Sequence, residues 1–364
     1  MKRHAPVTIR GPWQTPRTRS GLALALLAAA LTIPCAAACS GNTEVAVSGA
    51  TSSGTGGATT STSTSTSTSG TGGKSGTGGS TTATGVTGIS GGTLDLLNFV
   101  IVGDTRPPNE DDTAGYPTAI ITKIWQDVEA FSPRPAFAVT TGDYQFASTT
   151  GTQQAAQIGL YLTARAAFTN VSFAAMGNHE CTGATASNCG TGNTDGITTN
   201  YTTFMTKMLT PLGLKLPYYT VNIASPTKAW TAKLVFVAGN AWDATQATWL
   251  EGELAKPTTY TFVVRHEGAS ATTAPGVTPS IAIVNKYPFT LNLVGHTHEY
   301  YYNPQDREVV VGNGGAPLSG TGNYGYVVAQ QRASDGAIVF NEYDYMTNAV
   351  ANTFALKADG TTAP

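Results

Sequence analysis

The chain has 364 residues, with 20 basic and 22 acidic side chains and a net charge of −2. This balance excludes a strongly basic protein, and no basic surface of the kind that binds nucleic acid is evident. Hydrophobic residues make up 41% of the sequence, but they are unevenly distributed along it. We therefore expect only part of the chain to form a core.

The first 38 residues are predicted to be an export signal. A basic segment with Lys2 and four arginines precedes the apolar run 21–33, and three alanines before Cys39 then offer a cleavage site. The apolar run is short for a membrane span, which needs about 20 residues. A retained membrane anchor is the alternative interpretation.

Cys39 follows Ala36-Ala37-Ala38, an arrangement that resembles the lipoprotein box of bacteria. The resemblance implies that Cys39 is lipidated and becomes the mature N-terminus, with the membrane as a partner. It also implies a lipoprotein of the cell envelope, at the outer membrane or the cell surface. The same alanines suit ordinary cleavage, so free secretion is the alternative.

Residues 39–93 are almost entirely Ser, Thr, Gly and Ala. Such a segment buries too little apolar area to offset its ordering entropy, so we expect a disordered tether behind the lipidated end.

From residue 94 onward, apolar runs typical of buried strands alternate with helix-like segments, and a strand-rich section follows. This order predicts one α/β domain spanning 94–364, with one or two mixed sheets. The predicted strands are 97–102, 136–140, 171–175, 234–238, 260–264, 290–294, 308–311, 324–330 and 337–343. The predicted helices are 117–131, 152–168, 197–208 and 245–255.

Five of these strands run into side chains that can bind a metal ion, most of them beside a glycine that allows a sharp turn. In chain order the side chains are Asp104, Asp143, Asn178, His266 and His296, and His298 follows the last. All four histidines beyond the signal, His179 included, lie at these strand ends. Because ligands bind at the carboxyl ends of strands in open α/β sheets, the sequence predicts a metal site there.

The chemistry of these side chains narrows the choice of ion. Asp, Asn and His without a thiolate suit divalent Mn, Fe or Zn. Two such ions about 3.5–4 Å apart, sharing a carboxylate, can hold a phosphate, generate hydroxide and stabilise the leaving oxygen.

The motif series resembles the calcineurin-like metallophosphoesterase superfamily, which includes the purple acid phosphatases. The resemblance covers residues 104–298 and is carried chiefly by Gly-Asn-His-Glu at 177–180 and Gly-His-Thr-His at 295–298. Further similar stretches are Trp242-Asp243 and Gly312-Asn313-Gly314-Gly315-Ala316. The resemblance to this superfamily implies a four-layer α/β/β/α sandwich with two mixed sheets. It also implies hydrolysis of phosphomonoesters or phosphodiesters by a metal-activated hydroxide.

The resemblance also implies a role for each residue. Asp143 would bridge two ions, Asn178, His266 and His296 would complete one site, and Asp104 and His298 would belong to the other. Asn178 would also contact the substrate. His179 would contact the phosphate and aid the leaving group, and Glu180 would orient His179 as a second catalytic residue.

Arg106 departs from the family pattern, because it stands where a ligating His is usual and arginine cannot ligate. It is predicted to bind a substrate oxygen, and a salt bridge to a nearby acid is the alternative. The weakened site could be filled from Glu110, Asp111 or Asp112, unless these form a solvated loop. A non-catalytic metal-binding or ligand-binding surface lipoprotein is therefore the alternative function.

Cys181 and Cys189 remain after the signal and Cys39 are set aside. Their spacing in an exported chain predicts a disulfide that pins a loop, and a zinc pair is the alternative.

Overall fold

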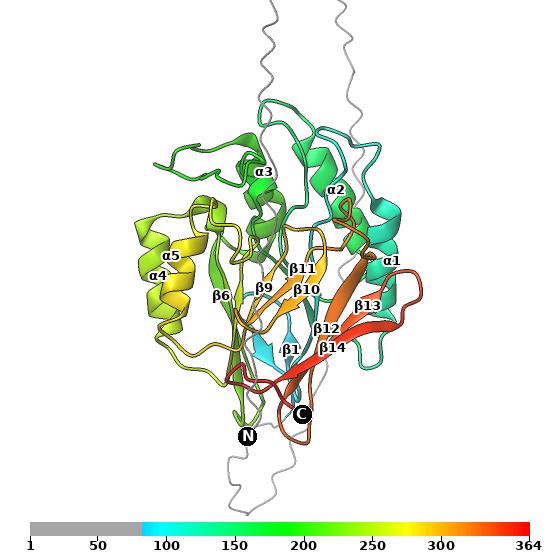
Figure 1. Cartoon of the computed structure of the whole chain (residues 1–364), viewed down its shortest axis with the longest axis vertical. Coiled ribbons are helices and arrows are strands. Elements are labelled where there is room, and N and C mark those ends of the chain that lie inside the picture. Colours follow the sequence, from blue (N-terminus) through cyan, green and yellow to red (C-terminus); the bar gives the residue numbers. More distant parts are fainter. Residues whose placement is uncertain (1–81) are drawn as a thin grey trace, which may run out of the picture. The chain divides into compact units, whose positions relative to one another are not determined.

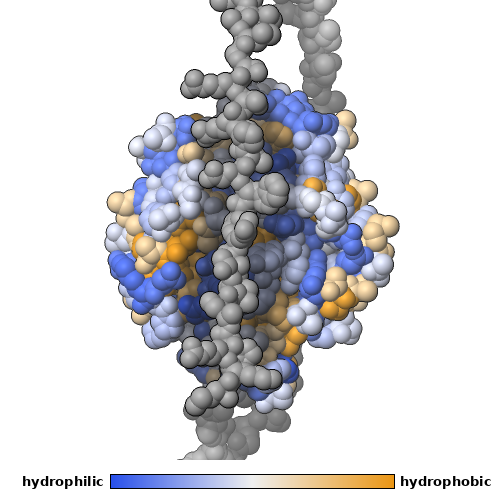
Figure 2. Space-filling model, viewed as in Figure 1, coloured by the Kyte–Doolittle hydropathy of each residue, from blue (hydrophilic) through white to orange (hydrophobic). Residues whose placement is uncertain are grey.

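The computed structural model describes residues 82–364, so the predicted export signal, Cys39 and most of the predicted tether lie outside it. Within the described residues no helix is long and apolar enough to cross a membrane. On the face visible in Figure 2, hydrophilic and hydrophobic residues are interspersed, and the hydrophobic ones gather in small separate patches.

Two mixed sheets form the centre of the domain. The eight-stranded sheet has the order β1-β2-β6-β7-β8-β9-β11-β10, and the six-stranded sheet has the order β14-β13-β12-β3-β4-β5. The strands are β1 Gly85–Val86, β2 Gly92–Thr93, β3 Asn98–Val102, β4 Phe137–Thr140, β5 Ser172–Ala174, β6 Tyr219–Ala224, β7 Thr231–Phe236, β8 Tyr260–Val264, β9 Leu291–Val294, β10 Tyr300–Asn303, β11 Glu308–Val311, β12 Gly325–Gln331, β13 Ile338–Asp344 and β14 Val350–Leu356.

Helices cover the outer faces of the two sheets, α1 and α2 beside the six-stranded sheet and α4 and α5 beside the eight-stranded sheet (Figure 1). The helices are α1 Thr118–Glu129, α2 Gln154–Arg165, α3 Thr199–Phe204, α4 Ala244–Leu254 and α5 Val277–Val284. Short 3₁₀ turns span Asn178–Glu180, Thr210–Leu212 and Gly239–Ala241, and a π turn spans Met205–Leu209. The predicted four-layer α/β/β/α sandwich is confirmed.

Aromatic side chains join the two sheets. Phe99 of β3 meets Phe262 of β8 with ring centroids 5.4 Å apart, and both rings are fully buried. On β7, Leu234 joins this core while its neighbour Val235 packs with Leu250 of α4 in a second cluster. Each such side chain contributes about 1.5–3 kcal/mol by leaving water, so the layers are held chiefly by apolar burial.

Several elements differ from the sequence-based predictions. The predicted helix 197–208 is a short α3 continued by the π turn. β6, α5 and β14 were not predicted. β1 and β2 fall inside the predicted tether, yet β2 pairs with β6, so the ordered sheet begins earlier than residue 94.

Candidate metal centre

Strand register brings the predicted metal ligands to one edge of the sheets. In the six-stranded sheet β3 and β4 run parallel with Val102 opposite Thr140, so Asp104 and Asp143 follow at similar heights. In the other sheet β8 and β9 run parallel, which places His266 near His296. Because the sheets are stacked, the two pairs converge, as the sequence predicted.

Two glycines allow this convergence. A Cβ atom on Gly142 would lie 2.6 Å from His266 Nδ1, and one on Gly295 would lie 2.2 Å from Asp104 Oδ2. Any side chain at either position would therefore displace a residue of the cluster.

The backbone at the cluster is strained. Asp104, Asp143, His296 and His298 have φ values of 56°, 58°, 74° and 51°, in the left-handed region. Non-glycine residues adopt this region at a cost of about 1–3 kcal/mol each, and such strain concentrates at functional sites. The surrounding fold therefore holds these four side chains in positions that local preferences alone would not select.

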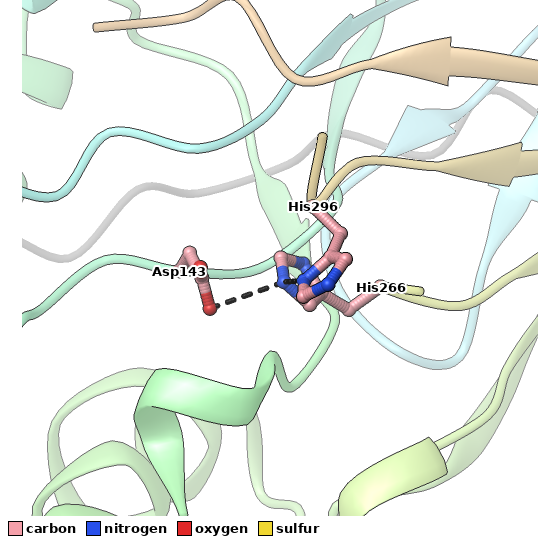
Figure 3. A group of neighbouring side chains, drawn as sticks. All are labelled: Asp143, His266 and His296. Atoms are coloured by element: carbon pink, nitrogen blue, oxygen red, sulfur yellow. Dashed lines mark hydrogen bonds and ion pairs between the residues drawn. The ribbon is translucent and has the colours of Figure 1, made fainter. Parts of the chain in front are cut away.

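A first set of ligand atoms comes from Asp143, Asn178, His266 and His296. His266 Nε2 lies 3.2 Å from Asp143 Oδ1, 3.1 Å from Asn178 Oδ1 and 3.3 Å from His296 Nδ1. Asn178 Oδ1 lies 3.2 Å from His296 Nδ1. In Figure 3 the carboxylate of Asp143 and the rings of His266 and His296 point toward one another.

Backbone carbonyls orient this set. His266 Nδ1 lies 2.8 Å from the carbonyl oxygen of Thr141, which can only accept, so Nδ1 carries the proton and Nε2 faces the cluster. Asn178 Nδ2 donates to the carbonyl oxygen of Gly183 at 2.6 Å, which turns its Oδ1 inward. The roles of Thr141 and Gly183 could not be predicted from the sequence, because each residue acts through its backbone carbonyl.

A second set consists of Asp104, Asp143 and His298, whose ligand atoms lie within 4.8 Å of one another. His298 Nε2 is 3.6 Å from Asp104 Oδ1, and His298 Nδ1 donates to the carbonyl oxygen of Pro317 at 2.7 Å. Both carboxylate oxygens of Asp104 accept from the backbone N–H of His296, which ties the two sets together.

Arg106 lies beside the second set. Its Nε is 3.7 Å from Asp143 Oδ2, and its guanidinium carbon lies 4.8 Å from the centre of the Phe146 ring. The salt bridge considered for Arg106 is therefore present.

Among residues 82–364, no further acidic or histidine side chain joins the second ligand set. Asp111 and Asp112 bond the backbone N–H groups of Ser148 and Gly115 in a partly exposed loop that also holds Glu110, and the ligand groups of the described residues do not include them. The structure thus favours the solvated loop considered for these acids over a role as metal ligands, since the carboxylates of Asp111 and Asp112 bond backbone N–H groups. The hydroxyl of Tyr144, the residue after Asp143, bonds Thr140 and Ala175 in the core and does not belong to the ligand cluster.

His179 and Glu180 have different roles in the structure. His179 Nε2 lies 3.9 Å from Asp143 Oδ2, and its ring packs edge-on against Phe146 with centroids 4.6 Å apart. The carboxylate of Glu180 accepts from the backbone N–H groups of Asp143, Tyr144 and Gly177, each at 2.9 Å. Glu180 therefore holds the Asp143 loop in place, and the prediction that it orients the His179 ring was wrong.

Burial raises the pKa of Asp104 well above its usual range, so the charge that favours a cation in the cluster is chiefly that of Asp143. Burial opposes the charged form of His266, yet Asp143 and Asp104 raise its pKa well above the usual range. Burial alone would raise the pKa of Asp143, but His266 and His179 together hold that pKa well below the usual range. The negative charge of Asp143 thus favours positive charge near His266 Nε2, the atom around which the other donor atoms of the first ligand set lie.

The first set fits a metal ion. Ligand atoms bound at about 2.1 Å are separated by roughly 3.0–3.4 Å in tetrahedral or octahedral geometry, and the contacts at His266 Nε2 fall in that range. The structure therefore supports binding of a divalent metal ion. The second set fits less well, because it has three protein ligands and a neighbouring guanidinium.

The loop after Glu180 is closed by the predicted disulfide, which joins Cys181 and Cys189. The backbone N–H of Cys181 donates to the carbonyl oxygen of Asn178 at 2.9 Å. The disulfide therefore supports a loop that holds a metal-ligand candidate.

A cavity of about 410 Å³ is lined in part by the residues that follow His298. Glu299, which follows His298 directly, lines it together with Ser319, whose N–H donates to the carbonyl oxygen of His298. Glu342 and Asp344 also line it, so its wall carries negative charge.

Comparison with known proteins supports the fold. No family model matches the sequence, and no curated protein matches it. Among solved structures, GAP50, "the anchor in the inner membrane complex of Plasmodium", superposes with a TM-score of 0.52 and 15% identity over 72% of this chain and 89% of its own. Purple acid phosphatase PPD1 from yellow lupin (Lupinus luteus) superposes with a TM-score of 0.51 and 16% identity over 72% of this chain.

The chain has the calcineurin-like phosphoesterase fold. It spans about half the length of the lupin phosphatase, since the match covers 54% of that protein. At these identities the likeness establishes the architecture, and the chemistry has to be argued from the site itself.

Proposed function

We propose that the chain is a metal-dependent hydrolase of phosphomonoesters or phosphodiesters. The observation that carries the proposal is the first ligand set, in which His266 Nε2 has three other donor atoms within 3.1–3.3 Å. His179 and Arg106 lie beside Asp143, which both sets share, and they are the groups that phosphoryl transfer needs next to an ion.

Each neighbouring side chain has a separate task. A bound divalent ion supplies Lewis acidity toward a phosphoryl oxygen and lowers the pKa of bound water. Arg106 binds another non-bridging oxygen of the ester through its planar fork. Asn178 presents its Oδ1 to the ligand set and one N–H to Gly183, and the second N–H of its amide contacts the substrate. Both side chains orient the phosphorus for in-line displacement.

His179 is positioned to assist the leaving group. Burial lowers its pKa to about 4, and the Phe146 ring fixes its plane. A phosphate ester brought beside the ring supplies negative charge, which raises that pKa again and favours the protonated form. His179 can then give a proton to the departing oxygen, a contribution worth about 10²–10⁴-fold in rate.

The test is turnover of chromogenic phosphate monoesters and diesters by the purified chain, loaded with Mn, Fe or Zn. Activity that depends on the ion and falls on His179→Ala supports the proposal. Absence of turnover with both ester classes and all three ions would overturn it.

A non-catalytic metal-binding or ligand-binding protein is the second candidate. Arg106 beside Asp143 favours it, because the site departs from the family pattern there. The likeness to GAP50, described as an anchor, also suits it. Binding of metal and inorganic phosphate with full folding but no turnover would distinguish this candidate from the hydrolase.

We also propose that the domain is exported and tethered to the membrane through a lipid on Cys39, with a phosphate ester as its substrate. The sequence around Cys39 supports this proposal. Labelling with a radioactive fatty acid should mark the chain and fail to mark Cys39→Ser. Labelled chain in the variant, or a wild-type chain found free in the medium, would contradict it.

A further inference from the structure

The Arg106 side chain is fixed beside the metal centre from several sides. Only 16% of it is exposed, and its terminal nitrogen donates to the carbonyl oxygen of Pro107 at 3.2 Å. The Phe146 ring lies against its guanidinium, and Asp143 Oδ2 lies 3.7 Å from its Nε. The positive charge therefore has a defined position and is not free to move into solvent.

The Nε–H of Arg106 is buried and has no hydrogen-bond partner among the described residues. An unpaired buried donor is unfavourable, and the neighbouring carboxylate is too distant to satisfy it. The geometry therefore leaves one donor of a permanently charged group available to an oxygen from outside the chain.

The two oxygens of Asp143 face different neighbours. Oδ1 lies at His266 Nε2 and also accepts from the backbone N–H of His179, whereas Oδ2 faces Arg106. An ion bound to Oδ2 at about 2.1 Å would lie within about 6 Å of Arg106 Nε. Two positive groups at that separation repel, and the second ligand set offers only Asp104 and His298 besides Asp143 to offset the repulsion.

We propose that the chain binds one metal ion, at Asp143, Asn178, His266 and His296, and that Arg106 takes the place of a second ion. Its fixed charge neutralises Asp143 Oδ2, and its free N–H binds a phosphate oxygen. The phosphate contact rests on the proposed function, whereas the ion count does not.

The deciding experiment counts bound ions without measuring turnover. Purified chain is equilibrated with excess Mn²⁺, desalted, and analysed by mass spectrometry for metal content and by electron paramagnetic resonance for spin coupling. The wild type should hold one ion and show an uncoupled signal. Arg106→His, which restores a ligand and removes the charge, should hold two ions with a coupled signal.

Arg106→Lys serves as the matched control, because it keeps the charge and adds no usual ligand, and it should hold one ion. Unfolding midpoints close to that of the wild type show that each variant is folded. Two ions of similar affinity in the wild type, or one ion in Arg106→His, would overturn the proposal.

Titration of the manganese form with inorganic phosphate tests the second half of the inference. Arg106→Gln should weaken phosphate binding at least 10-fold while the wild type binds it measurably. Equal affinity in both would refute the phosphate contact. Because neither readout requires hydrolysis, an inactive protein with one ion would reject the proposed function and leave the ion count standing.

Discussion

The two halves of the metal centre share Asp143 but differ in how their charge is balanced. Around His266 the donor atoms lie 3.1–3.3 Å apart and face one another, an arrangement that a cation stabilises. Around Asp104 the separation to His298 is 3.6 Å, and the cation is already part of the chain, as Arg106.

If the one-ion proposal holds, one residue of the motif changes the chemistry of half the site while the fold stays the same. Asp104 and His298 keep their strained backbone although their usual third partner is absent. A sequence motif with six of the seven expected ligands therefore does not establish two equivalent ions.

The largest effect is expected for Asp143→Ala, because both halves depend on this carboxylate. Metal content should fall from about one ion to nearly none, and hydrolysis should fall at least about 10⁴-fold, the level reached when metal and acid–base contributions are both lost. Elemental analysis and steady-state kinetics measure the two quantities. Asp111→Ala, in the nearby loop, is the control and should retain both; a variant Asp143→Ala with its metal intact would contradict the assignment.

His179→Gln should lower kcat about 10²–10³-fold with metal content unchanged, because the ring acts on the leaving group and lies outside the ligand set. The loss should shrink for esters of acidic phenols, whose leaving oxygens need little protonation. A loss independent of the leaving group would assign His179 to binding only.

Much of the metal centre could be predicted from the sequence because apolar runs indicate buried strands. The residues that follow parallel strands lie at the same edge of the sheet. The partners of Glu180 could not be predicted, since they are backbone N–H groups. α5 was missed because Pro279 lies in its first turn, where proline is tolerated but reads as a breaker. β14 was missed because most of its residues are exposed and give no buried stripe.

Glu180→Ala should destabilise the domain by about 3 kcal/mol or more, because three backbone N–H groups lose their acceptor. Metal affinity should fall with it, since the Asp143 loop loses its support. Glu180→Gln keeps one accepting oxygen, so this variant should lose less stability than Glu180→Ala. Urea unfolding measures the free energy, and an unchanged midpoint in the alanine variant would show that the loop is held elsewhere.

Replacing Cys181 and Cys189 with serine should cost about 2–3 kcal/mol of stability, the loop-closure contribution for a short loop. Loss of the disulfide should also disturb the first ligand set, because this loop holds Asn178 through the carbonyl oxygen of Gly183. Metal affinity is expected to fall about 10-fold, as for other changes to groups that support ligands. Full affinity in the serine variant would separate the disulfide from the metal centre.

The smallest effect is expected at the cavity wall, for Glu299→Gln. Glu299 follows His298 directly in the sequence, and it lines the acidic cavity together with Glu342 and Asp344. A carboxylate there repels a dianionic monoester more than a monoanionic diester. Its removal should raise kcat/KM about 2–5-fold for monoesters and less for diesters, as expected for partly solvated charges about 4 Å apart or more. Kinetics at low and high salt measure this, because screening should shrink the gain. A gain that salt leaves unchanged would mean that Glu299 acts by shape, and that the charge asymmetry of the centre ends at Arg106.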